Sequence, residues 1–225
     1  MKSKSYKQAV KSFEQEKKYS LEKALEILEK FPKVKFDESV EMHIRLNVDS
    51  SKSDQQVRAS VALPHGTGKT KKIAAFTETQ QDEAKKAGAD IVGGEELVGQ
   101  ILKDKKIDFD VAVATPEMMP KLSKAARILG PRGLMPNPKT GTVGPKVVEM
   151  IEELKKGKAD FKTDKTGNIH QVIGKRSFSK EQLKENAEML IETINKNKPT
   201  KSKGILIKNI TLTATMTPGI KVKNS

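Results

Sequence analysis

The 225-residue sequence contains no cysteine and no tryptophan. Without cysteine the chain can form no disulfide and no zinc–thiolate site, and it has no thiol nucleophile. It also lacks an apolar run of about 18 residues, which a membrane-spanning helix needs, and residues 1–7 lack the apolar segment of a secretory signal. These absences predict a cytoplasmic protein that has no metal, no cofactor and no membrane partner.

Aromatic side chains are also scarce, with seven Phe and two Tyr in the whole chain. Proteins that bind single-stranded nucleic acid usually stack successive bases on aromatic rings, and this composition disfavours that mode. It suits a folded RNA better, which proteins contact through the backbone, the 2′-hydroxyls and the shape of the minor groove. Phe36 is one candidate contact, and the alternative for it is a position in the core.

Positive charge is in excess, because 43 Lys and Arg against 29 Asp and Glu give a net charge of +14. A charge of this size on a small protein indicates a polyanionic partner, most often a nucleic acid. Residues 66–158 carry 17 basic and 13 acidic residues, which leaves 26 and 16, a net of +10, on the two flanking segments. Beyond Glu192 there is no acidic residue, but seven lysines follow: Lys196, Lys198, Lys201, Lys203, Lys208, Lys221 and Lys223. We therefore expect the polyanion site mainly on the structure that the two ends build, although a run of charge is also typical of a solvated face.

Residues 127–143 are the most distinctive segment, with two Arg, one Lys, three Gly, three Pro and no acidic residue. Glycine lets the backbone approach another molecule closely, and proline stiffens the path between those points. The side chains of Arg127, Arg132 and Lys139 therefore predict a semi-rigid basic loop for a phosphate-rich partner. The alternative is an ordinary surface connection.

The two ends of the chain combine strand-like alternation with two helices. Ser20 is a candidate N-cap for a helix that Pro32 ends, and Ser179 with Gln182 predicts a capping box for another helix. A polar turn is expected over residues 49–54. The predicted strands are residues 40–48, 57–63, 159–162, 168–173 and 204–216.

The middle of the chain alternates short apolar strands with helices, which indicates a mostly parallel sheet covered on both faces. The predicted strands are residues 73–76, 91–92 and 108–114, and the predicted helices are residues 80–87, 95–102, 117–129 and 147–154. Each outer segment has about 65 residues and would be only marginally stable alone. The simplest fold is therefore α/β with two domains, in which residues 1–65 and 159–225 form a split domain and residues 66–158 are inserted. Gly66, Gly68 and Gly157 at the crossings are candidate hinges.

Gly68, Lys69 and Thr70 resemble the end of a nucleotide-binding P-loop. That motif requires a glycine five residues before Gly68, and Leu63 stands there instead. A phosphate cradle of this type is therefore not expected.

The remaining candidates for catalysis are isolated. His43, His65 and His170 are far apart in the sequence and do not have metal-ligand spacing. Asp108 and Asp110 have the spacing of two carboxylates on one face of a strand, but such residues are more often charges at a strand end. No nucleophile, base and orienting group occur together, so we expect no catalytic residue and no enzyme.

Several motifs, in order, resemble the bacterial ribosomal protein L1 family over residues 19–222. They are Lys35-Phe36-Asp37-Glu38, Ser53-Asp54-Gln55, Leu63-Pro64-His65-Gly66, residues 88–95, Ala114-Thr115-Pro116, residues 130–143 and residues 164–170. The resemblance implies a discontinuous α/β domain with an inserted, mobile Rossmann-like domain. It also implies that the first domain binds ribosomal RNA.

The resemblance assigns the RNA contacts to three stretches of the first domain. They are Lys35, Phe36, Lys165, Thr166, Gly167, His170, Lys175, Ser177, Thr215, Met216, Thr217, Pro218 and Gly219. Thr217 departs from the family pattern, which usually has glycine directly after Thr-Met. A β-branched residue restricts the backbone there, so either the contact tolerates the added methyl and hydroxyl or this segment binds RNA less tightly.

The resemblance implies a non-enzymatic constituent of the large ribosomal subunit. It would bind the 23S rRNA stalk, assist release of deacylated tRNA from the exit site, and repress translation by binding its own mRNA. The basic loop, with Arg127, Arg132 and Lys139, would meet tRNA or a second RNA surface. The alternatives are a phosphate-ligand enzyme that uses residues 66–70 and a free-standing translational repressor.

Overall fold

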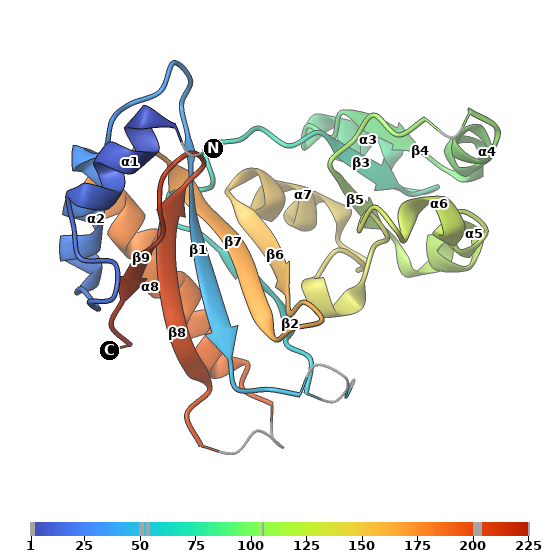
Figure 1. The fold of residues 1–225 in the computed structure, drawn as a ribbon. Coiled ribbons are helices and arrows are strands. Elements are labelled where there is room, and N and C mark those ends of the chain that lie inside the picture. Colours follow the sequence, from blue (N-terminus) through green and yellow to red (C-terminus); the bar gives the residue numbers. More distant parts are fainter. Residues whose placement is uncertain (1–2, 50–51, 53–54, 105, 200–203, 225) are drawn as a thin grey trace. The chain divides into compact units, whose positions relative to one another are not determined.

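The protein is described from a computed structural model, which covers residues 3–49, 52, 55–104, 106–199 and 204–224 (Figure 1). The chain divides into two compact units, Met1–Gly68 with Ala159–Ser225 and Lys69–Lys158. Both contain helices and strands, so the α/β class is confirmed. Their independence as domains, with the boundaries given above, remains a prediction. Lys201, Lys203, Ser53 and Asp54 lie outside the described residues.

The first unit is built on a four-stranded antiparallel sheet with the order β7-β1-β8-β9. Its strands are Asn168–Lys175, Ser39–Leu46, Ile207–Ala214 and Ile220–Val222. Alternate residues of β1 are buried, as the sequence pattern predicts. The inner strand β1 thus comes from the N-terminal segment, and the three other strands come from the C-terminal segment.

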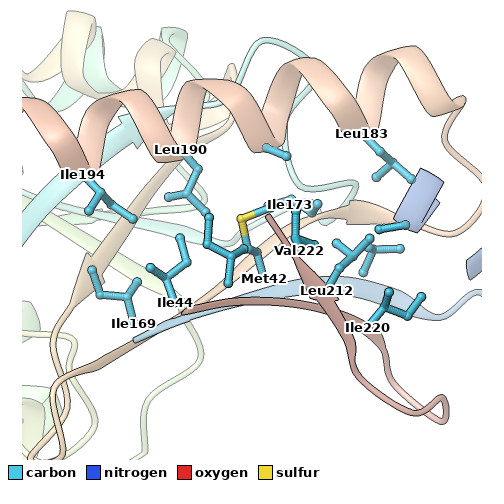
Figure 2. Packing of buried hydrophobic residues seen from close by; sticks show 14 of the residues in the cluster. Met42, Ile44, Ile169, Ile173, Leu183, Leu190, Ile194, Leu212, Ile220 and Val222 are labelled. Carbon is cyan, nitrogen blue, oxygen red and sulfur yellow. The ribbon is translucent and has the colours of Figure 1, made fainter. Parts of the chain in front are cut away.

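Two helices cover one face of this sheet. Helix α2 is Leu21–Lys30, with the Ser20 hydroxyl as its N-cap, and helix α8 is Lys180–Lys196, with the predicted capping box of Ser179 and Gln182. Figure 2 shows how side chains of α8 point toward those of the sheet. The labelled residues are Met42, Ile44, Ile169, Ile173, Leu183, Leu190, Ile194, Leu212, Ile220 and Val222, all of them buried. The opposite face of the sheet keeps polar side chains such as His170, which is exposed.

Two elements of the first unit were not predicted from the sequence. Helix α1, Lys4–Lys11, is amphipathic but buries only Ala9, so its apolar signal is weak. Strand β9 has three residues, too few for a clear alternation. A separate two-stranded sheet pairs β2, Arg58–Ala62, with β6, Lys158–Lys162, close to the predicted strand positions.

The second unit has a three-stranded parallel sheet with the order β4-β3-β5. The strands are Ile91–Gly93, Ile73–Phe76 and Val111–Ala114. Ile73 and Ala75 pack against α3, Gln81–Lys86, and α7, Val147–Lys155. Ala74 and Phe76 pack on the other side against α4, Glu95–Asp104, and against Met118 and Leu122. The sheet is therefore covered on both faces, which confirms the prediction for this segment.

Three predicted elements differ from the structure. Instead of one helix over residues 117–129 there are three short pieces, Pro116–Met118 in 3₁₀ form, α5 at Met119–Ser123 and α6 at Ala126–Leu129. Pro120 has no N–H to continue a helix, and Ala125 bonds to the Leu122 carbonyl over the shorter three-residue span. Strand β5 begins at Val111 rather than residue 108, and β8 begins at Ile207 and ends at Ala214 rather than spanning 204–216.

All three predicted hinge glycines have a positive φ, with values of 65° at Gly66, 72° at Gly68 and 107° at Gly157. The buried Asn186 of α8 fixes the first crossing, because its side chain accepts from His65 N and donates to Gly66 O. These contacts lie within the first unit. Hinge motion at the crossings stays a prediction.

Candidate nucleic-acid interface

The predicted RNA residues of the first unit lie in two groups at opposite ends of β7. One group joins the loop before β1, the end of β7 and the turn after β8, because Ser39 pairs with Lys175 and Val40 pairs with Ala214. The other group is the turn that precedes β7 at Asn168. Seven residue steps separate Asn168 from Lys175, which is roughly 23 Å at the usual rise of a strand. The predicted contacts thus form a strip along the strand, not a single cluster.

The loop between α2 and β1 presents Lys35 and Phe36 to solvent. The Phe36 side chain is 55% exposed, so the alternative of a core position is wrong. Its neighbour Asp37 accepts hydrogen bonds from the Ser177 amide at 3.1 Å and from the Ser177 hydroxyl at 2.8 Å. These bonds hold the loop against the segment that follows β7. A hollow of about 300 Å³ opens beside Phe36.

Lys175 and Ser177 are close to this loop but already engaged within the protein. The Lys175 ammonium donates to Asp37 O at 3.3 Å and to the Ser39 hydroxyl at 3.1 Å. The Ser177 hydroxyl is bound to Asp37. These bonds therefore join the loop to the end of β7. Because an ammonium group has three donors, Lys175 keeps one for an additional acceptor.

The turn after β8 carries residues 215–219. Met216 is 58% exposed, and its amide donates to Glu38 Oε1 at 3.0 Å. The Thr217 hydroxyl accepts from Ala214 N at 2.9 Å, so it stabilises its own turn. This contact gives the threonine a local role at the position where the family pattern has glycine. Pro218 is buried and Gly219 is exposed.

Two charged residues that the sequence interpretation overlooked connect these segments. Arg176, between Lys175 and Ser177, forms an ion pair with Glu38, and the two side chains are only 9% and 0% exposed. The Arg176 amide also donates to Glu38 O at 2.8 Å. Their signal in the sequence is weak, since an Arg and a Glu 138 positions apart look like ordinary surface charges.

At the other end of β7, Asp164 organises the turn that contains Lys165, Thr166 and Gly167. Its carboxylate accepts from Thr166 N and from Asn168 N, both at 2.8 Å, and from the Thr166 hydroxyl. Bonds from Asn168 N and Thr166, which favour the charged form, hold the pKa of Asp164 far below its usual range. Gly167 has a φ of 83°, which a side chain would strain.

His170 lies between the two groups and is paired with His43 across the strands. Their Nδ1 atoms are 2.8 Å apart, so one ring donates and the other accepts. Burial and the neighbouring His170 lower the pKa of His43, which favours its neutral form. Within the described part of the chain, no group of three or more His, Cys, Asp or Glu is placed to hold a metal ion. The histidine pair orients His170 on the open face of the sheet.

The basic loop belongs to the second unit. Arg127, Arg132 and Lys139 are all exposed, and no described residue forms an ion pair with them. Asn137 braces the loop through two bonds. Its side-chain oxygen accepts from Lys139 N at 2.8 Å, and its backbone N–H donates to the Thr142 hydroxyl at 2.8 Å. Part of the predicted loop is helical, because Arg127 lies on α6 and Lys139 lies in a 3₁₀ helix, Pro138–Thr140. Its role as a basic loop for a phosphate-rich partner stays a prediction.

The other candidate motifs of the sequence have ordinary structural roles. The segment over residues 66–70 leads into strand β3 rather than into a helix, unlike a P-loop. Asp108 and Asp110 both bind Lys72, at 3.0 Å each, just before β5. His65 forms a 2.6 Å contact with Glu185. No helix of the described residues is both long and apolar enough to cross a membrane.

These features define a strongly basic α/β protein with a polar strip along an antiparallel sheet. Residues 28–218 match the model of the ribosomal protein L1p/L10e family, and the chain belongs to that family. It is similar to proteins named large ribosomal subunit protein uL1. That of Mycoplasma capricolum subsp. capricolum is 51% identical over 98% of both chains. Those of Kosmotoga olearia and Persephonella marina are each 50% identical, over 98% and 97% of this chain and 95% and 92% of theirs.

Proposed function

We propose that the protein is a non-enzymatic constituent of the large ribosomal subunit that binds the 23S rRNA stalk through the strip along β7. The observation that carries this proposal is the union of Lys35 and Phe36, Lys175 and residues 215–219 at one end of the sheet. Direct hydrogen bonds join these segments, which come from distant parts of the sequence. The uL1 names of its relatives support the ribosomal assignment.

The chemistry of the strip suits a folded RNA. It offers hydroxyl, amide and lysine donors along a strand, with two exposed apolar side chains and no row of aromatic rings. Such groups bind phosphates and 2′-hydroxyls and fit the shape of a groove, whereas sequence-specific single-strand binding relies on stacking. The net charge of +14 adds a long-range attraction to any polyanion.

Two further activities belong to the same proposal. Through a mobile stalk the protein assists release of deacylated tRNA from the exit site, with Arg127, Arg132 and Lys139 of the second unit as the contact to tRNA or a second RNA surface. It also represses translation of its own mRNA, which would present a structure that resembles the rRNA site. Both are expected from the family resemblance and from the exposed charge of the loop.

The test is binding to a stalk-type rRNA fragment and to a scrambled duplex of equal length, across a salt series. We expect discrimination that persists at physiological salt. With about four phosphate contacts, the log–log slope of affinity against salt should be about −3. Equal, salt-sensitive binding to both RNAs would reduce the interaction to generic charge and refute the proposal. Co-sedimentation with large subunits separates a ribosomal protein from a free-standing repressor.

A further inference from the structure

We propose that the buried ion pair of Glu38 and Arg176 is a positioning device that determines which RNA shapes the interface accepts. The inference rests on the proposed RNA-binding function. In this proposal neither side chain of the ion pair contacts RNA. It fixes the loop that carries Phe36 relative to the turn that carries Met216, and these two exposed side chains then define a fixed spacing.

Arg176 holds the Phe36 loop from its N-terminal side. Its guanidinium donates to the carbonyls of Leu28 and Pro32 at 3.1 Å each and to the carbonyl of Phe31. These carbonyls end helix α2 and begin the loop, so a cation there also satisfies helix-terminal acceptors. The loop therefore leaves α2 at a position that the arginine sets.

Glu38 holds the other side of the interface. One carboxylate oxygen is paired with Arg176, and the other accepts from the Met216 amide at 3.0 Å. A second link runs alongside, because Ser39 N donates to the Thr215 hydroxyl at 3.1 Å. A single carboxylate thus connects the loop before β1, the end of β7 and the turn after β8.

The arrangement is poorly suited to stability alone. Burying two charges carries a desolvation cost, and replacing such a pair by well-packed apolar residues is often neutral or stabilising. Among the side chains that the structure describes, Arg176 Nε is the one buried nitrogen or oxygen without a hydrogen-bond partner. An unsatisfied donor of this kind is a further cost. The pair is therefore better explained by the geometry that it imposes than by the free energy of folding.

The consequence concerns discrimination. Phe36 and Met216 are 55% and 58% exposed, and each sits on a segment that the pair ties down. If the pair is removed, both side chains remain available but their spacing becomes variable. Binding to a shaped RNA site then carries the entropic cost of ordering the two segments, whereas generic attraction of a duplex to surface charge is unaffected.

The test is the double variant Glu38→Leu with Arg176→Met, which removes both ties and leaves the net charge at +14. The matched control is Glu22→Leu with Lys184→Met, an exposed ion pair between α2 and α8 with a 2.5 Å contact. We expect the first variant to stay folded by circular dichroism. It should lose about tenfold or more in discrimination between the stalk-type RNA and the scrambled duplex, which is within the range of measured interaction energies between coupled residues. Its affinity for the scrambled duplex and its salt slope should match those of the wild type and the control.

A folded double variant that discriminates like the wild type would overturn the inference. If the wild type itself does not discriminate, the proposed function is refuted, which is a distinguishable result. Should the double variant fail to fold, Arg176→Lys keeps the charge but replaces the five-donor guanidinium by one ammonium. Loss of discrimination in this folded variant supports the positioning role, and unchanged discrimination contradicts it.

Discussion

Replacement of Asp164 tests how the turn before β7 is held. We consider Asp164→Ala, which removes every side-chain acceptor, and Asp164→Asn, which keeps one amide oxygen. In the wild type the carboxylate accepts from the amides of Thr166 and Asn168 at 2.8 Å each. It also accepts from the Thr166 hydroxyl at 2.9 Å. The turn between these residues includes Gly167 at a φ of 83°. Backbone bonds also support it, from Asp164 N to Asn168 O at 2.8 Å and from Leu46 N to Gly167 O at 2.9 Å.

The expected cost follows from these bonds. A side chain that satisfies backbone N–H groups at the start of a helix contributes about 0.5–2 kcal/mol, and the Asp164 turn is comparable. Because two amides and a hydroxyl are involved, we expect Asp164→Ala to lower the free energy of unfolding by about 2 kcal/mol at pH 7. Asp164→Asn should cost about half of that, because it retains one acceptor but loses the charge.

The same carboxylate gives a pH dependence with a definite sign. Its pKa is lower in the folded protein than in the unfolded chain, where about 3.9 is usual, so it stabilises the fold above that pH. As the pH falls below about 4, the unfolded chain takes up the proton first and the contribution is lost. The difference in the free energy of unfolding between wild type and Asp164→Ala should therefore shrink between pH 5 and pH 3. Uptake of one proton limits the loss to about 1.4 kcal/mol per pH unit, and the partial exposure of the side chain, 36%, screens the charge and lowers the total effect.

Urea unfolding at several pH values measures the stability, and the amide NMR signals of Thr166 and Asn168 report on the turn directly. Two results would refute the reasoning. One is an alanine variant as stable as the wild type at pH 7. The other is a difference that remains constant from pH 7 to pH 3.

Three further predictions concern single residues. Phe36→Ala should leave the free energy of unfolding within about 0.5 kcal/mol, because the ring is exposed, but should weaken binding of the stalk-type RNA about tenfold; equal affinity would exclude the contact. Thr217→Gly should cost about 1 kcal/mol of stability, because Ala214 N loses its hydroxyl acceptor; thermal unfolding checks this, and an unchanged midpoint would contradict it. Ser179→Ala should cost about 1 kcal/mol in urea unfolding, since it breaks the capping box with Gln182, but RNA affinity should not change; a change in affinity would place α8 in the interface.

The sequence was most informative where a local pattern determines the structure. The alternation over β1, the apolar strands of the parallel sheet and the capping box of Ser179 and Gln182 were all predicted and are confirmed. Errors occur where backbone chemistry outweighs the pattern. The helix predicted over residues 117–129 is broken, because Pro120 and the tight turn at Ala125 interrupt an otherwise helical spacing.

The candidate site shows a different limit of prediction from sequence. Its residues came from a family resemblance, and no local pattern indicates that Lys35 lies near residues 215–219 while Lys165 lies at the far end of β7. That arrangement depends on the strand order, which pairs segments more than 120 positions apart. The buried Glu38 and Arg176 were missed for the same reason, since burial of a charged residue follows from tertiary packing rather than from its neighbours in sequence.

The position of β1 in the sheet has a consequence for synthesis of the chain. Both strands that pair with it, β7 and β8, begin only at Asn168 and Ile207. A chain made from its N-terminus therefore exposes β1 with two unpaired edges until most of the protein has been translated, and open edges favour association with other strands. The second unit, Lys69–Lys158, is continuous and has all its sheet partners before that point. We therefore expect folding during translation to start in the middle of the sequence and to be completed only when the last strands have been made.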